Sequence, residues 1–210
     1  MIIPVFDKNI SVQNYDLETF AYRNRLFKTV NMILSLPDVV HLGQGSPEQY
    51  GEGISTVALN KHLQINTALS FDQHELGSWM KTALISAAQE LGIEAAAGAT
   101  DFTYVRSWMN RIYKGCSGAV HQHCGPDSSL CDLTGIFYLQ APENSAELVF
   151  INEEIVESNK SKYTDYPIEK RQQIKPLPGM LVCHDPRIPH AVTEHNSDDP
   201  RTCLVFDIKF

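Results

Sequence analysis

Histidines concentrate in the second half of the chain, where five of the eight fall between positions 121 and 195. Two of them, His121 and His123, are separated by a single residue in a segment with the character of a β-strand. Side chains at i and i+2 of a strand point to the same face, so both imidazoles can reach a single metal ion. A third ligand must come from a distant strand, and we expect it to be His190. His184 and His195 compete for this role, and at most one of the three is expected to bind.

The third ligand position is open to two residues. Either His121, His123 and His190 form a three-histidine site, or Asp127, beyond a Gly-Pro turn, supplies a carboxylate and leaves one of His121 and His123 outside the coordination sphere. His123 is favoured, because i, i+2 geometry needs no special turn. A site of three neutral imidazoles would leave its metal more positive than two histidines and a carboxylate do.

An arginine stands eleven residues after His190, where Arg201 opens the last apolar strand of the chain. A guanidinium among apolar residues is costly unless it meets an anion, and its planar fork suits a carboxylate. A metal and an arginine one strand apart fit a 2-oxoacid cosubstrate, whose keto acid end chelates the metal while its far carboxylate binds Arg201. The alternative is a structural ion pair of Arg201 with Asp207 or Glu147.

Two further polar side chains are candidates for cosubstrate binding, Tyr138 and Asn110. The alternative for Tyr138 is a core position with a locally satisfied hydroxyl. Cys124 and Cys131 flank the histidine pair, but no second cysteine pair completes a zinc site, so we expect ordinary buried thiols.

The elements that must position these residues differ between the two halves. Residues 16–35 and 75–92 have apolar side chains at helical spacing, followed by Pro37 and Gly92 as stops. The segment 41–62 is rich in glycine and is predicted to be a loop, with a short strand at 54–59. Its part 43–53 is a candidate lid over a pocket.

From residue 100 the pattern changes to short strands separated by turn residues. A polar insertion at 158–176 between two strands is a second candidate lid. Helices followed by strands predict an α+β fold: a double-sheet jelly roll, or double-stranded β-helix, with supporting N-terminal helices. We expect one domain over 1–210, with 1–100 as helical and loop support and 101–210 as the β-core.

Composition excludes several classes of protein. The net charge is −8, with 17 basic and 25 acidic residues, which argues against nucleic acid as a partner. No apolar run is long enough to span a bilayer, and the N-terminus lacks the pattern of a secretory signal, so we expect a cytoplasmic protein. A hydrolase elbow, a P-loop and a Rossmann fingerprint are also missing.

The order of these segments resembles the Fe(II)- and 2-oxoglutarate-dependent oxygenases with a double-stranded β-helix, and most of all the small bacterial and phage oxygenases related to prolyl hydroxylases. The resemblance covers about half the chain and rests on 107–110, 121–123, 133–139, 178–182, 189–192 and Arg201. The chain departs from the family at His123, where most members have the carboxylate of an H-x-D or H-x-E motif.

The resemblance implies Fe(II), 2-oxoglutarate and O2 as cofactors, with His121 and His190 at the catalytic centre. It implies hydroxylation of an unactivated C–H bond of a small molecule or an amino-acid side chain, with release of succinate and CO2. Two alternatives are a cupin-type three-histidine dioxygenase that does not use 2-oxoglutarate, and a non-catalytic metal-binding β-sandwich. The substrate and the oligomeric state, monomer or homodimer, are left open by the sequence.

Overall fold

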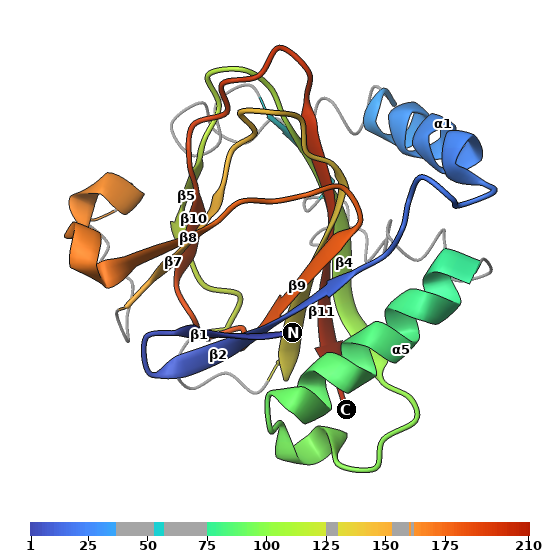
Figure 1. Cartoon of the computed structure of the whole chain (residues 1–210), viewed down its shortest axis with the longest axis vertical. Coiled ribbons are helices and arrows are strands. Elements are labelled where there is room, and N and C mark those ends of the chain that lie inside the picture. Colours follow the sequence, from blue (N-terminus) through green and yellow to red (C-terminus); the bar gives the residue numbers. More distant parts are fainter. Residues whose placement is uncertain (37–52, 57–74, 125–129, 153–159, 161) are drawn as a thin grey trace.

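Two antiparallel sheets face each other in the computed structural model of the chain (Figure 1), which describes residues 1–36, 53–56, 75–124, 130–152, 160 and 162–210. The larger sheet has the strand order β1-β2-β9-β6-β11-β4-β3, and the smaller has the order β5-β10-β7-β8. The strands of the larger sheet are β1 (Ile2–Val5), β2 (Lys8–Asn14), β3 (Ile54–Ser55), β4 (Thr103–Ile112), β6 (Leu133–Gln140), β9 (Met180–His184) and β11 (Arg201–Lys209). Those of the smaller sheet are β5 (Gly118–His121), β7 (Leu148–Ile151), β8 (Arg171–Ile174) and β10 (His190–Val192).

From β4 onward the chain repeatedly crosses between the sheets: β4 is in the larger, β5 in the smaller, β6 in the larger and β7 in the smaller. After β8 the chain returns through β9, β10 and β11 in the same alternation. This crossing makes the double-stranded β-helix that the sequence predicts. The expected α+β fold class is therefore confirmed.

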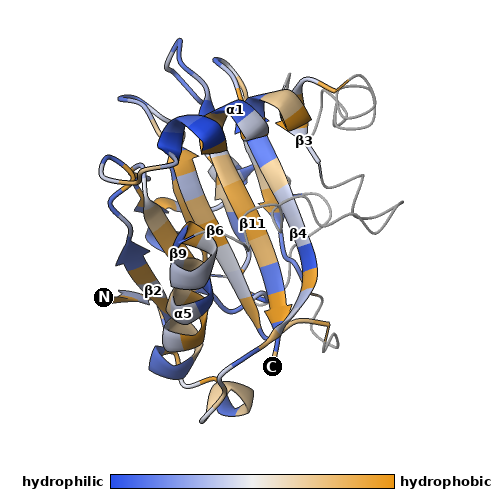
Figure 2. Cartoon of the chain, turned by 90° about the vertical axis from the view of Figure 1, so that its right-hand side faces the viewer, coloured by the Kyte–Doolittle hydropathy of each residue, from blue (hydrophilic) through white to orange (hydrophobic). Residues whose placement is uncertain are grey.

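Two helices, α1 (Arg23–Leu34) and α5 (Glu75–Glu90), cover the outer face of the larger sheet (Figure 2). The buried stripe of α5, which includes Leu76, Met80 and Leu84, packs on side chains of β6, β9 and β11. A short 3-10 helix, η2 (Glu94–Ala96), follows α5. The helix predicted over 75–92 is thus confirmed, whereas the one predicted over 16–35 begins only at Arg23.

The N-terminal strands were not anticipated. The expectation that residues 1–100 are mainly helical and loop support is wrong for residues 2–14, because β2 pairs with β9 and β1 pairs with β2, which extends the larger sheet by two strands. The first two residues of the short strand expected at 54–59 form β3, and residues 57–59 lie outside the described residues. The candidate lid 43–53 lies outside the described residues except for Gly53. In the second candidate lid, the 3-10 helices η3 (Tyr163–Asp165) and η4 (Ile168–Lys170) lead into edge strand β8.

One apolar core lies between the helices and the larger sheet, and a second fills the space between the two sheets. On β11 the side chains of Cys203 and Val205 point into this core, whereas Leu204 and Phe206 point outward to the helices. The same alternation on β4 directs Trp108 inward. The face of each strand that looks between the sheets is therefore also the face that lines the candidate site.

Candidate metal centre

Three imidazoles meet at one end of the space between the sheets. His121 ends β5 and His190 begins β10, and the two residues lie opposite each other in the antiparallel pairing of these strands. His123 follows two residues after His121. One nitrogen of each ring lies within 4.8 Å of the others, so these side chains are arranged to share one metal ion.

The expectation that both members of the His-x-His pair lie in one strand is wrong. Strand β5 ends at His121, and the main chain of His123 turns to other partners: its N–H donates to the carbonyl of Pro186 at 3.0 Å. The guanidinium of Arg106 donates to the carbonyl of His123 at 2.9 Å. The pairing of β5 with β10 ends at His121 because β10 begins at His190, the residue opposite. The two rings nevertheless stack, with centroids 5.4 Å apart.

Each of the three rings has one nitrogen tied to an oxygen acceptor. Nδ1 of His121 is 2.8 Å from the carbonyl of Ala119, and Nδ1 of His190 is 3.0 Å from the carbonyl of Ile188. Nδ1 of His123 is 2.7 Å from a carboxylate oxygen of Asp207. Because carbonyls and ionised carboxylates only accept hydrogen bonds, each Nδ1 carries the proton and each Nε2 keeps a free lone pair. Nε2 is thus the ligand atom that each ring offers.

Burial and neighbouring groups favour the neutral form of two of these rings, His121 and His190. Desolvation, followed by the neighbouring His123, lowers the pKa of His121 to about 4. Desolvation and the other histidines also hold the pKa of His190 well below the ordinary value. Metal binding requires the neutral imidazole, so both rings are in the binding form at neutral pH.

The two competing histidines have other surroundings. Both ring nitrogens of His195 contact the main chain, since Nδ1 accepts from the N–H of Ala146 at 3.1 Å and Nε2 donates to the carbonyl of Asp199 at 2.8 Å. His184 is buried on β9, and its ring lies edge-on to that of His190 with centroids 4.8 Å apart. Its Nδ1 is bonded to the carbonyl of Asp185, and its Nε2 has no partner within the described residues. Neither ring joins the cluster of three.

Arg201 is buried, with 3% of its surface exposed, and among the described residues no carboxylate forms an ion pair with it. Its guanidinium donates to the hydroxyl of Tyr138 at 3.2 Å and lies 4.8 Å from the centre of that ring. Its Nε is buried without a partner in the same part of the chain. The alternative ion pair with Asp207 is not formed, because Asp207 pairs with Arg106 instead. Within the described structure the guanidinium is thus a cation that lacks an anion.

The other expected residues have mixed placements. Burial raises the pKa of Tyr138 to about 12 despite the nearby Arg201, so its phenol stays protonated. The amide of Asn110 and the hydroxyl of Ser55 are hydrogen-bonded at 2.6 Å, and Asn110 lines the cavity described below. Asp127 lies outside the described residues. The buried thiols of Cys124 and Cys131 are in contact, and burial raises the pKa of Cys131, so it stays a thiol as expected.

A cavity of about 190 Å³ joins the imidazoles to the arginine. His121, His123, His190 and Arg201 all line it. The rest of its wall is mainly apolar and includes Trp108, Ile136, Leu148, Val192, Cys203 and Val205. The three imidazoles and the buried cation thus open into one largely apolar chamber, which is suited to a small anion that also chelates the metal.

Comparison with known families decides the class of protein. Residues 106–207 match the family model described as "Putative 2OG-Fe(II) oxygenase", a segment that runs from β4 to β11 and contains the three histidines and Arg201. This segment belongs to the 2OG-Fe(II) oxygenase family. The chain is therefore an oxidoreductase of the 2-oxoglutarate-dependent type, with the expected cofactors Fe(II), 2-oxoglutarate and O2. No curated protein matches it significantly by sequence.

Solved structures show the same fold at low sequence identity. A prolyl-4-hydroxylase of Pseudomonas putida has a TM-score of 0.57 and 13% identity, over 95% of this chain and 91% of that one. The viral collagen prolyl hydroxylase of Paramecium bursaria chlorella virus-1 has a TM-score of 0.57 and 13% identity, over 95% and 94%. The epimerase SnoN, solved with Fe3+ and alpha ketoglutarate, has a TM-score of 0.65 and 12% identity, over 95% and 78%.

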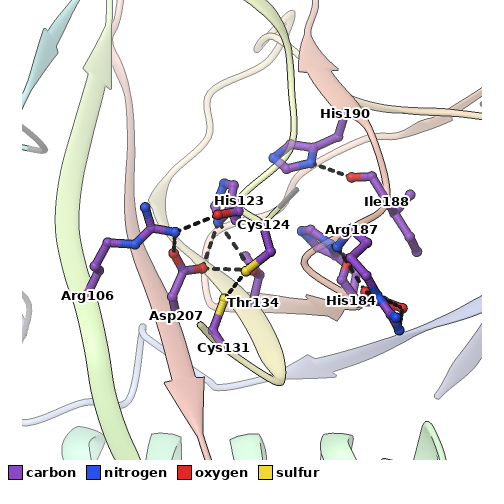
Figure 3. Close-up of polar contacts among 11 residues, drawn as sticks. Arg106, His123, Cys124, Cys131, Thr134, His184, Arg187, Ile188, His190 and Asp207 are labelled. Carbon is purple, nitrogen blue, oxygen red and sulfur yellow. Dashed lines mark hydrogen bonds and ion pairs between the residues drawn. The ribbon is translucent and has the colours of Figure 1, made fainter. Parts of the chain in front are cut away.

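Within this oxygenase, sequence reasoning missed the residues behind His123. Asp207 is fully buried and is held by His123, Arg106 and the hydroxyl of Thr134 (Figure 3). The alternation of β11 carried a signal, because Asp207 is six residues from Arg201 and shares its inward face.

No helix in the described part of the chain is long and apolar enough to cross a membrane.

Proposed function

We propose that this oxygenase hydroxylates an unactivated C–H bond of a small molecule or an amino-acid side chain. One oxygen atom of O2 enters the product, and the other enters the succinate that forms from 2-oxoglutarate with release of CO2. The observation that carries the proposal is the shared cavity, into which three imidazoles open together with a buried guanidinium that has no ion-pair partner among the described residues.

Each of these side chains has a separate role in the proposal. His121, His123 and His190 hold Fe(II) through Nε2, and the bound iron supplies the chemistry that activates O2. Arg201 binds the far carboxylate of 2-oxoglutarate with its planar fork. The hydroxyl of Tyr138, which stays protonated, accepts a hydrogen bond from the guanidinium and would donate its own proton to the same carboxylate. Asn110 stays a candidate contact because it lines the cavity, although its amide already forms a hydrogen bond with Ser55.

The walls of the cavity support a substrate with an apolar reacting part. Trp108, Leu148 and Val192 present hydrocarbon to the chamber, which excludes water from the reacting C–H bond. Two of the similar structures are prolyl hydroxylases, and a third is an epimerase. Hydroxylation is the outcome that we propose, and the net charge of −8 disfavours nucleic acid as substrate. A single domain and a cytoplasmic location stay predictions.

Anaerobic titration of the metal-free protein with Fe(II), and then with 2-oxoglutarate, tests the cofactor site. The Fe(II)–2-oxoglutarate chelate has a visible charge-transfer band. We expect the band in the wild type, and we expect Arg201→Ala to need at least about tenfold more 2-oxoglutarate, as befits the loss of a charge-assisted pair. Arg23→Ala is the matched control, because Arg23 pairs with Glu18 at the surface. Bound iron without a band would contradict the proposal.

Product analysis tests the reaction itself. Candidate substrates, beginning with prolyl peptides and free aliphatic amino acids, are incubated with Fe(II), 2-oxoglutarate and O2, and succinate is measured together with product mass. Hydroxylation adds one oxygen atom for each succinate formed. Succinate formed while the mass of the candidate substrate stays unchanged would contradict hydroxylation of that substrate.

A further inference from the structure

One of the three ring nitrogens that face away from the metal position has a charged partner. His121 and His190 each contact the main-chain carbonyl of the residue two positions earlier, as strand histidines can by themselves. His123 instead contacts the carboxylate of Asp207, which is 84 residues away in the sequence, on β11. His123 is also the position where most of the family has a carboxylate ligand. The chain has thus placed a carboxylate behind the ring that replaces one.

The carboxylate of Asp207 is fixed at both oxygens. Oδ1 accepts from Nδ1 of His123 and from the hydroxyl of Thr134, each at 2.7 Å, and Oδ2 lies 2.5 Å from a guanidinium nitrogen of Arg106. Asp207 and Thr134 are fully buried, and 4% of the His123 side chain is exposed. Figure 3 shows Arg106 and His123 both in contact with Asp207, with Arg106 on the side away from His190.

A simple structural ion pair does not explain this geometry. Arg106 and Asp207 are register partners on neighbouring strands, and a pair that only joined these strands would need one oxygen of the carboxylate. The other oxygen, Oδ1, is directed at the ring of His123, and the hydroxyl of Thr134 donates to the same oxygen. The same guanidinium also donates to the carbonyl of His123, so both ends of this residue are fixed.

From this arrangement we propose that Asp207 is a positioning residue for the metal centre. Its carboxylate holds His123 with Nε2 directed to the metal, and it supplies a negative charge behind the imidazole, across the hydrogen bond to Nδ1. The proposal rests on the proposed function, since it needs His123 as a ligand. A carboxylate behind a ligating imidazole raises the basicity of the ring and fixes its tautomer, and its loss typically lowers metal affinity 10- to 100-fold. Arg106 stabilises the ionised carboxylate in its buried position.

A double-mutant cycle with Co(II) as the probe tests this inference. Affinity of the metal-free protein for Co(II) is measured from its visible absorption in competition with a chelator, for wild type, Asp207→Asn, His123→Asp and the double variant. In the wild-type background we expect Asp207→Asn to lower affinity about 10- to 100-fold. In the His123→Asp background no imidazole is present at this position for Asp207 to orient, so we expect a change of less than about threefold.

Controls separate this role from general damage. Asp185→Asn removes a carboxylate that pairs with Arg187 and touches none of the three rings, so Co(II) affinity should stay within about twofold of wild type. Asp207→Asn also leaves Arg106 without its ion pair and can impair folding. Arg106→Gln combined with Asp207→Asn removes both charges, with Arg106→Gln alone as its reference, and should show the same loss relative to that reference.

The possible outcomes are distinct. Equal losses of Co(II) affinity from Asp207→Asn in both backgrounds, or no loss in the wild-type background, would overturn the role of Asp207 while leaving the three-histidine site intact. If His123→Ala leaves Co(II) affinity unchanged, the ligand set of the proposed function fails, and the inference fails with it. A second readout is the tautomer: ¹⁵N spectra of the metal-free protein should show His123 protonated at Nδ1, and this preference should weaken in Asp207→Asn.

Discussion

At the scale of single residues, Arg201 carries the most information about ligand chemistry. A buried guanidinium costs several kcal/mol unless its charge is compensated. Here its neighbours are a tyrosine hydroxyl, an aromatic ring and the thiol of Cys203, which is 3.9 Å away. These contacts orient the guanidinium but do not neutralise it. Its retention at a buried position is explained when an anion such as the far carboxylate of 2-oxoglutarate binds there.

Replacing Tyr138 by phenylalanine tests this arrangement of Arg201. The change removes only the hydroxyl that the guanidinium contacts, so the affinity for 2-oxoglutarate should fall about 2- to 10-fold, as expected for one hydrogen bond. Titration of the iron-loaded protein with 2-oxoglutarate measures the effect. Tyr166→Phe is the matched control, because Tyr166 is an equally buried tyrosine whose hydroxyl contacts the carbonyl of Lys160. Equal affinities in wild type and Tyr138→Phe would remove the hydroxyl from the cosubstrate site.

At the scale of elements, β11 serves the site and the core together. Its inward face presents Arg201, Cys203 and Asp207 to the space between the sheets, and its outward face presents Leu204 and Phe206 to the helices. The position of the site therefore depends on how closely the helices pack on the larger sheet. Gly135 on β6 sets that approach, because a Cβ there would lie 2.7 Å from Cδ2 of Leu84 on α5.

Replacing Gly135 by alanine should therefore destabilise the protein. Glycine to alanine in a strand is otherwise mildly favourable for the backbone, so a loss would report the steric clash with Leu84. We expect about 1–3 kcal/mol from overpacking, measured by urea unfolding. In a Leu84→Ala background the added methyl group finds space, and the penalty should vanish. A penalty of the same size in both backgrounds would show that helix packing is not its cause.

The sequence predicted those elements whose periodicity is strong. The apolar stripe of α5 identified the helix, and the short apolar segments separated by turn residues identified strands such as β4 and β11. The start of α1 was misplaced because residues before Arg23 form other hydrogen bonds. The N–H of Tyr15 donates to the carbonyl of Gly179, and the carboxylate of Asp16 accepts from the N–H groups of Glu18 and Thr19. These contacts with a distant segment and within a local turn leave no mark on helical spacing.

The N-terminal hairpin escaped prediction because its turn lacks the usual residues. Phe6, between β1 and β2, has φ of 59°, a conformation in which glycine or asparagine is usual. In the site, the three histidines and Arg201 could be selected by type and spacing, and the structure brings them to one cavity. Asp207 was considered only as a partner for Arg201, because pairing across strands, here with Arg106, depends on a register that spacing does not reveal.

At the scale of the whole molecule, a metal at the three histidines would connect the two sheets. His121 and His190 belong to adjacent strands of the smaller sheet. His123 follows β5 but is held through Asp207 to β11, an inner strand of the larger sheet. An ion shared by these rings would therefore join the sheets at the wall of the chamber. Metal binding should stabilise the fold as a unit as well as prepare it for chemistry.

This linkage predicts that metal raises the thermal stability of the protein. A ligand that binds only the folded state at 100 times its dissociation constant stabilises it by about 2.7 kcal/mol. Co(II) should therefore raise Tm by several degrees in a thermal melt, and a chelator should reverse the shift. Mg²⁺, which prefers oxygen ligands, is the matched ion and should have no effect. His121→Ala should abolish the Co(II) shift because it removes one of the three ligands. A Co(II) shift that survives both His121→Ala and His190→Ala would place the stabilising metal elsewhere in the chain.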